Sequence, residues 1–331
     1  PPPPPPPPTQ PPRPPPHSTR IECRRQRQMC IRDRDRFPRV IPRHHHKIHL
    51  GVPLATPVPG TRAVDRGRIV LARGVIVEKM VLVLQDPTPA ELESHEKGED
   101  YEEKTAPPWV IDREQFKVDY THYLDRRRTH LFVLDLSSSE MTQITSGDFD
   151  DSEPAWSPDG GRIAFVSNRT ESPDTNYNSD IWVVDASNTN QGTDLRQITT
   201  NPGPDTPPAW SPDGKLITHI SETDPEAMLY ATRHLAVSSA SGGDLRVLTE
   251  ELDRIVSSPM FSVDGGQIYF ILEDSGEQNL AKISTRGGEV DRMISGTGIV
   301  SAFDLGPDNQ VAALITEPKQ PAEVFLYSQG Q

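Results

Sequence analysis

The stretch "PAWSPDG" occurs twice in this chain, at residues 154–160 and again at residues 208–214. Its proline presets the backbone angle that a type I turn needs at its second position, and its glycine takes a positive φ without steric cost. The residues after each copy, 162–166 and 215–220, alternate like a half-buried strand. Each copy therefore predicts the turn of a β-hairpin, with a tryptophan as the apolar anchor of the incoming strand.

Two weaker copies follow further along the chain. Residues 261–265 carry Phe261 in place of the tryptophan and Val263 in place of the proline, and residues 303–309 end on Asn309 instead of glycine. Asparagine enters the left-handed backbone region more readily than most residues, so this exchange preserves the turn. We predict hairpin turns at residues 157–160, 211–214, 262–265 and 306–309.

A second pattern alternates with these turns: an apolar strand, a polar break, and a strand that ends on an aliphatic residue followed by a hydroxyl residue. Its marks are Ile144 with Thr145, Ile198 with Thr199, Leu248 with Thr249, and Ile294 with Ser295. Two hairpins per period make four strands, and four strands in about 40–50 residues are typical of a β-propeller blade. The sequence predicts an all-β fold, an incomplete β-propeller of about four to five four-stranded antiparallel blades over residues 79–331, with Trp156 and Trp210 packed between blades.

The stretch before the repeats predicts one more strand and an insertion. Residues 80–84 are apolar and suit a strand, whereas residues 91–104, "ELESHEKGEDYEEK", are strongly acidic. We expect this acidic stretch to be a solvated helix or loop inserted in a blade. Its acids lack the regular ligand spacing of a calcium loop, so no calcium site is assigned to it.

Residues 1–78 have a different composition from the rest. Residues 1–80 carry 16 lysines and arginines against 5 acids, and residues 1–60 hold 18 of the 35 prolines. Such a segment buries too little apolar surface to fold, so we expect a disordered Pro/Arg-rich head. Three interpretations of the head stay open. It is a solvated tail, a tail that binds nucleic acid or proline-recognition domains, or sequence that is not native, because residues 24–34 resemble translated sequencing-adapter read-through.

Candidate metal ligands and cysteines are confined to this head, where no scaffold would hold them; they are His44, His45, His46, His49, Cys23 and Cys30. We therefore assign no metal site and no cofactor. After residue 80 the chain carries 18 basic and 43 acidic residues, which argues against a nucleic-acid partner. The sequence contains no apolar run of transmembrane length and no secretory signal pattern, so no membrane partner is expected. The absence of cysteine from the propeller region is compatible with a reducing cytoplasm, which is the expected location.

Four stretches carry a family resemblance: "VIDREQFK" (110–117), "YLDRRRTHLFVLDL" (123–136), "SGDFDDSEPAWSPDGGRIAFVSNR" (146–169) and "DIWVVDA" (180–186). Together they resemble the propeller of the prolyl oligopeptidase family, and most closely its acylaminoacyl-peptidase-like branch. The resemblance runs from about residue 80 to the end of the chain. The "WSPDG" phrase alone is less specific, because TolB-like propellers also use it.

The resemblance implies a serine peptidase in which the propeller limits access to short peptides. The catalytic Ser-Asp-His triad of that family lies in an α/β-hydrolase domain C-terminal to the propeller, and the chain contains no G-x-S-x-G pattern. We therefore assign no catalytic residue, and we expect this chain to be an inactive propeller fragment whose partners are the missing hydrolase domain and a peptide substrate. The turn serines Ser157 and Ser211 are each followed by proline, which has no N–H for an oxyanion hole.

Two other functions compete with this interpretation. The first is a TolB-like propeller that binds proteins without enzymatic activity, and the sequence that follows in the intact gene distinguishes it from the peptidase. The second is a lactonase-like propeller with a metal on its axis, which requires acidic and amide side chains to converge there. No spacing in the sequence demands such a convergence.

Overall fold

The computed structural model describes residues 69–71, 78–97, 108, 110–118, 122–227, 230–243, 245–296 and 298–327. All of them belong to one compact unit, Val52–Gln331. The expected disordered head, with its histidine cluster and both cysteines, lies outside the described residues apart from the short strand at 69–71. No helix in the described part of the chain has the length and apolar character needed to cross a membrane.

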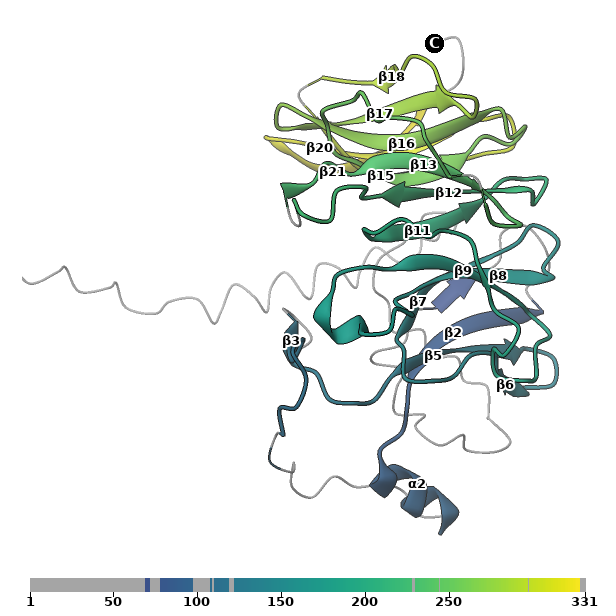
Figure 1. Ribbon diagram of the computed structural model, residues 1–331. Coiled ribbons are helices and arrows are strands. Elements are labelled where there is room, and N and C mark those ends of the chain that lie inside the picture. The colour runs from purple at the N-terminus through teal and green to yellow at the C-terminus, as the bar shows by residue number, and fades with distance from the viewer. Residues whose placement is uncertain are drawn as a thin grey trace, which may run out of the picture. The chain divides into compact units, whose positions relative to one another are not determined.

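The described chain folds as a β-propeller of antiparallel blades, as the sequence predicts. The first blade contains β1 (Ile69–Leu71), β2 (Lys79–Gln85), β5 (Thr129–Asp135) and β6 (Met141–Gln143). The second contains β7 (Asp151–Trp156), β8 (Arg162–Ser167), β9 (Asp180–Asp185) and β10 (Arg196–Gln197). The third contains β11 (Asp205–Trp210), β12 (Leu216–Ser221), β13 (His234–Ser239) and β14 (Leu245–Val247). Figure 1 shows these sheets following one another along the chain.

Two further groups of strands complete the described sheets. The fourth blade contains β15 (Val256–Phe261), β16 (Gln267–Asp274), β17 (Glu277–Ser284) and β18 (Asp291–Ile294). The last group contains β19 (Ile299–Leu305), β20 (Val311–Glu317) and β21 (Gln320–Tyr327), and one parallel pairing, Gln278 with Ile299, joins it to β17. The first strands of neighbouring blades touch, β7 against β11 and β11 against β15, so the blades pack side by side.

The four predicted hairpin turns are all present. The N–H of Gly160 donates to the carbonyl of Ser157 (2.9 Å), and the same bond recurs from Gly214 to Ser211 (2.9 Å) and from Gly265 to Ser262 (3.0 Å). Gly160 has a φ of 69°, and Asn309, which replaces the glycine in the last copy, has a φ of 55°. The predicted left-handed asparagine is therefore confirmed.

The threonine marks have a structural role that repeats from blade to blade. Each threonine hydroxyl accepts the N–H of the second or third residue of the neighbouring strand. The bonds run from Leu131 to Thr145 (2.9 Å), Ile181 to Thr199 (2.9 Å) and Leu235 to Thr249 (2.8 Å). All three threonines are buried. A buried backbone N–H without a partner is costly. The threonine therefore satisfies an N–H of the third strand and holds the end of the fourth strand against it.

The apolar core lies between blades rather than inside one. One cluster joins Val81 and Leu131 of the first blade to Phe165 of the second, and Trp156 packs against it. The next joins Ile181 of the second blade to Ile217 of the third, with Trp210 against it. Two more clusters continue the series along the later blades. The tryptophans therefore lie between blades as predicted, although both are half-buried.

The segment between β2 and β5 does not continue the blades that the sequence predicts. The sequence predicts blades over residues 79–331, but the described residues between Gln85 and Thr129 form an excursion from the first blade. The excursion contains α2 (Pro89–Glu96) and a separate two-stranded ribbon, β3 (Lys117–Val118) with β4 (His122–Tyr123). Thr88 begins α2 with a capping box: its hydroxyl accepts the N–H of Glu91 (3.1 Å), and its own N–H donates to the Glu91 carboxylate (2.6 Å). The expected helix in the acidic stretch is thus present over its first part.

The N-terminal boundary of the first blade also differs from the expected one. The strand β1 pairs with β2 through residues 69–71, before the expected start at residue 79. A three-residue apolar strand in a basic segment gives no repeat signal of its own, because the "WSPDG" phrase is missing there.

Candidate functional site

The connections between strands distinguish the two faces of the propeller. Ser167 at the end of β8 pairs with Asp151 at the start of β7, and Ser221 at the end of β12 pairs with Asp205 at the start of β11. The long connections at 86–128, 168–179 and 222–233 all leave from this side, which we call the loop face. It exposes most of the large apolar side chains of the loops, including Val110, Ile111, Phe116, Tyr123, Tyr177 and Tyr230. Binding residues concentrate on such loops when a rigid scaffold carries them.

The junction between the first and second blades carries a buried ion-pair network. Asp151 is completely buried, and Arg169 donates to its Oδ1 from Nη2 at 2.7 Å. His130 of the first blade lies on the other side, with Nδ1 3.5 Å from Asp151 Oδ2. The Arg169 guanidinium also lies 4.9 Å from the ring centre of Phe149 and 5.7 Å from that of Trp182. The buried carboxylate is therefore matched by a cation that aromatic rings hold in place.

The excursion is fastened to the same junction by charged side chains. Arg128 donates to Asp148 (2.7 Å) and to Asp150 (3.0 Å). Arg113 donates to Asp174 Oδ1 (3.1 Å), and the backbone N–H of Gln115 donates to the same oxygen (3.1 Å). Two of the four stretches that carry the family resemblance, 123–136 and 146–169, thus lie against each other in space.

At the junction between the second and third blades, no described lysine or arginine pairs with a buried carboxylate. Asp180 and Asp205 are both buried, and the pKa of Asp180 is raised to about 6, first by burial and then by the negative charge of Asp205. Both carboxylate oxygens of Asp205 lack a hydrogen-bond partner among the described residues. The ring of His219, also fully buried, has Nδ1 3.4 Å from Asp205 Oδ1, and its Nε2 lies 3.0 Å from Ser238 Oγ.

A pocket of about 410 Å³ opens on the loop face above this second junction. Its walls come from the connection before β9, the turn before β11 and the connection after β12, and include Asn178, Gly203, Glu222, Asp224 and Arg233. Glu222 is only 7% exposed. A Cβ added to Gly203 would lie 2.0 Å from the carbonyl oxygen of Glu222, so only glycine fits between the two segments.

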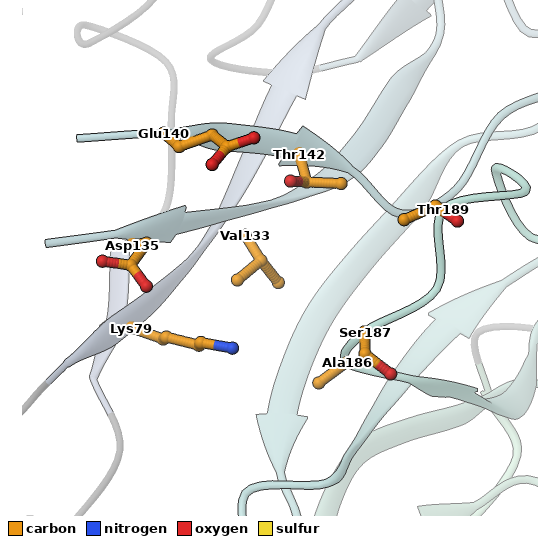
Figure 2. Close-up of a pocket in the computed structure, with 8 residues that line it drawn as sticks. All are labelled: Lys79, Val133, Asp135, Glu140, Thr142, Ala186, Ser187 and Thr189. Carbon is orange, nitrogen blue, oxygen red and sulfur yellow. The ribbon is translucent and has the colours of Figure 1, made fainter. Parts of the chain in front are cut away.

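A smaller pocket of about 170 Å³ lies on the opposite face, between the first and second blades. Figure 2 shows Lys79 of β2, Asp135 of β5 and Glu140 around it, with Ser187 and Thr189 across the gap. The Asp135 carboxylate caps the turn after β5, and hydrogen bonds from the Ser137 hydroxyl and from backbone N–H groups lower its pKa to about 2. The Asp135 carboxylate is engaged in the hydrogen bonds of its turn, and with this low pKa it is no general base near neutral pH.

The turn serines have structural partners only. Ser157 Oγ donates to Asp159 Oδ1 (2.5 Å) and accepts the N–H of Arg162 (2.9 Å), and Ser211 repeats the arrangement with Asp213 (2.7 Å) and Leu216 (2.9 Å). These bonds close the hairpins, which matches the structural interpretation of the "WSPDG" phrase. Within the described ranges, no group of three or more His, Cys, Asp or Glu side chains is arranged to hold a metal ion.

Sequence reasoning did not find the two blade junctions. Asp180, Asp205, His219 and Glu222 carry no motif, and none was singled out. The signal that finds them is the distance of 54 positions between Trp156 and Trp210. It makes Asp151, the first residue of β7, equivalent to Asp205, the first residue of β11. The side chains around these two aspartates can then be compared position by position.

The chain is similar in sequence to two bacterial peptidases. It is 31% identical over 133 residues to the uncharacterized peptidase YuxL of Bacillus subtilis. This alignment covers 40% of this chain and 18% of YuxL. It is 28% identical over 160 residues to dipeptidyl-peptidase 5 of Porphyromonas gingivalis, which covers 48% of this chain and 23% of that protein. The matched part therefore spans about a fifth of the length of these relatives.

A solved structure shares the fold. The acylaminoacyl peptidase of Pyrococcus horikoshii superposes with a TM-score of 0.54 at 17% identity, covering 76% of this chain and 35% of the peptidase. No family model matches the chain. The structural likeness establishes the β-propeller fold, and both sequence relatives are named as peptidases.

Proposed function

We propose that this propeller is part of a prolyl-oligopeptidase-type serine peptidase that acts on short or acylated peptides. The observation that carries the proposal is the sequence match of 133 and 160 residues of this chain to two proteins named as peptidases. The fold shared with an acylaminoacyl peptidase supports it.

In this proposal an α/β-hydrolase domain supplies the catalytic serine, and the propeller selects substrates by size. The turn serines Ser157 and Ser211 support this division, because each hydroxyl donates to the aspartate of its own turn and accepts a backbone N–H within the hairpin. The relatives are several times longer than the matched part, which leaves room in them for such a domain. The cysteine-free blades support a reducing compartment such as the cytoplasm.

Peptide hydrolysis by the product of the intact gene tests the proposal. We expect cleavage of short acylated or free peptides and at least tenfold slower cleavage of a folded protein or a long unstructured chain. A product that binds a protein partner and cleaves no peptide would favour the TolB-like alternative instead. A product that cleaves long chains as fast as short peptides would overturn the size-selection role.

A further inference from the structure

The two identical phrases allow the two blade junctions to be compared position by position. The same 54-position shift that relates Trp156 to Trp210 relates Asp151 to Asp205. The strand registers agree, because Asp151 pairs with Ser167 and Asp205 pairs with Ser221. Both aspartates are completely buried at the start of the first strand of their blades. The buried carboxylate is therefore present at both junctions.

The large side chains that surround this carboxylate at the first junction are missing at the second. Phe149 corresponds to Gly203, and Arg169 corresponds to Thr223. Trp182, which pairs with Phe165, is replaced by Ala236, which pairs with His219. Two rings and a guanidinium are therefore missing at the second junction. The backbone of Glu222 packs directly against Gly203, and both residues line the pocket of about 410 Å³.

The second junction also carries more negative charge than the first. Glu222 stands where the first junction has Asn168, and Asp224 lines the same pocket. Asp180 and Asp205 lie beneath them. The bases at this junction are His219, which is buried below the pocket, and Arg233, which is exposed at its rim and has no ion pair among the described residues.

Several acceptor oxygens at the second junction have no donor. Within the described residues, Asn178 Oδ1, Asn201 Oδ1 and both oxygens of Asp205 are buried without a hydrogen-bond partner. Glu222, a residue that is more than nine-tenths buried, lines the pocket, and its carboxylate makes no hydrogen bond or ion pair with the part of the chain that is described. Acceptor oxygens without donors are unfavourable in a largely buried site, so a donor from outside would stabilise this one.

We propose that the pocket at the second junction binds the guanidinium group of an arginine side chain from a peptide ligand. The group supplies a positive charge, as Arg169 does at the first junction, and it pairs with Glu222 and Asp224, which line the pocket. A guanidinium fits better than an ammonium ion because its planar fork donates two parallel hydrogen bonds to a carboxylate. Only the identity of the ligand as a peptide rests on the proposed peptidase function, whereas the guanidinium site itself does not.

Titration of the purified chain with N-acetyl-arginine amide, followed by calorimetry or NMR, tests the site. The neutral comparison ligand is N-acetyl-citrulline amide, which has the same shape without the charge. We expect the arginine amide to bind at least tenfold more tightly. Equal affinity for the two ligands, or no binding of the arginine amide at millimolar concentration, would overturn the proposal whether or not the gene product is a peptidase.

Three variants locate the binding. Glu222→Gln should weaken binding of the arginine amide at least tenfold, whereas the control Glu171→Gln, an exposed acid of the loop face outside the pocket, should leave it unchanged. Thr223→Arg places a guanidinium of the chain itself at the position equivalent to Arg169. This side chain should occupy the pocket and abolish binding of the arginine amide. Because Thr223 is exposed, this variant tests the site even if Glu222→Gln fails to fold. Undiminished binding by Thr223→Arg would contradict the assignment.

Discussion

At the scale of single residues, equivalent positions in neighbouring blades carry a histidine in one blade and an aspartate in the next. His130 and Asp180 each precede the strand residue whose N–H is bonded to a buried threonine. His130 faces Asp151, which Arg169 neutralises, whereas Asp180 faces Asp205 without an arginine. The residue at this position therefore stabilises the first junction, where it is His130, and destabilises the second, where it is Asp180.

The first prediction concerns the pH dependence that follows from Asp180. Its pKa is raised from 3.8 to about 6 in the folded chain, so the folded state binds more protons than the unfolded state between these values. The free energy of unfolding should therefore fall as the pH rises through 4 to 6. Asp180→Asn removes this penalty and should be more stable than the parent at pH 7.5, by an amount on the order of 1–3 kcal/mol.

Urea unfolding at pH 4, 5, 6 and 7.5 measures the effect. The control is Asp185→Asn, at the exposed other end of the same strand, which should change the pH dependence little. A parent chain that gains stability relative to Asp180→Asn as the pH rises would contradict the charge repulsion between Asp180 and Asp205.

The second prediction compares the two tryptophans of the repeated phrase. Trp210 Nε1 donates to the carbonyl of Ala155 in the preceding blade (3.0 Å), whereas Trp156 Nε1 is buried with no partner among the described residues. Replacement by phenylalanine removes a bond in the first case and an unsatisfied donor in the second. We expect Trp210→Phe to cost about 1–2 kcal/mol more unfolding free energy than Trp156→Phe. Equal costs in urea unfolding would show that the bond between the blades contributes nothing.

At the scale of elements, the excursion between β2 and β5 depends on one carboxylate of the next blade. Asp174 accepts hydrogen bonds from the Arg113 side chain and from the backbone N–H groups of Glu114 and Gln115. It lies in a short 3-10 turn, Pro173–Thr175, of the connection before β9. Since the strands β3 and β4 are short, this carboxylate is a main anchor of residues 113–115, together with the bonds from the Gln115 side chain to the carbonyls of Pro173 and Asn176.

The third prediction is that Asp174→Ala releases this segment without unfolding the blades. Amide hydrogen exchange at Glu114 and Gln115 should accelerate at least tenfold, while exchange in β8 and β12 stays unchanged. Glu171→Ala in the same connection is the matched control. Unchanged exchange at residues 113–118 would show that other contacts hold the excursion.

The elements divide into those that the sequence predicts and those that it does not. The hairpin turns and the threonine marks are predictable because each depends on residues a few positions apart in the chain, such as Ser157 with Gly160. The course of the excursion is not predictable, because Arg113 and Asp174 are far apart in sequence and follow no periodicity. The pocket also depends on partners from two blades, and only the 54-position comparison brings Phe149 and Gly203 into correspondence.

At the scale of the whole molecule, the blades provide a scaffold and the loop face provides the chemistry. Each core cluster is shared by neighbouring blades, so the blades support one another and leave the connections free to vary. The turns of the opposite face are bound internally by serine and aspartate. The loop face carries the exposed aromatic side chains and the acidic pocket, and it is the side on which we expect a peptide to be bound.

The central claim is that this propeller serves a serine peptidase whose nucleophile lies outside the blades. Treatment of the intact gene product with a fluorophosphonate probe, followed by peptide mapping, tests it most directly. We predict stoichiometric labelling of one serine beyond residue 331, loss of peptide hydrolysis on labelling, and no labelling of this chain alone. Labelling of a serine within residues 69–327, or an intact product with no reactive serine, would contradict the account.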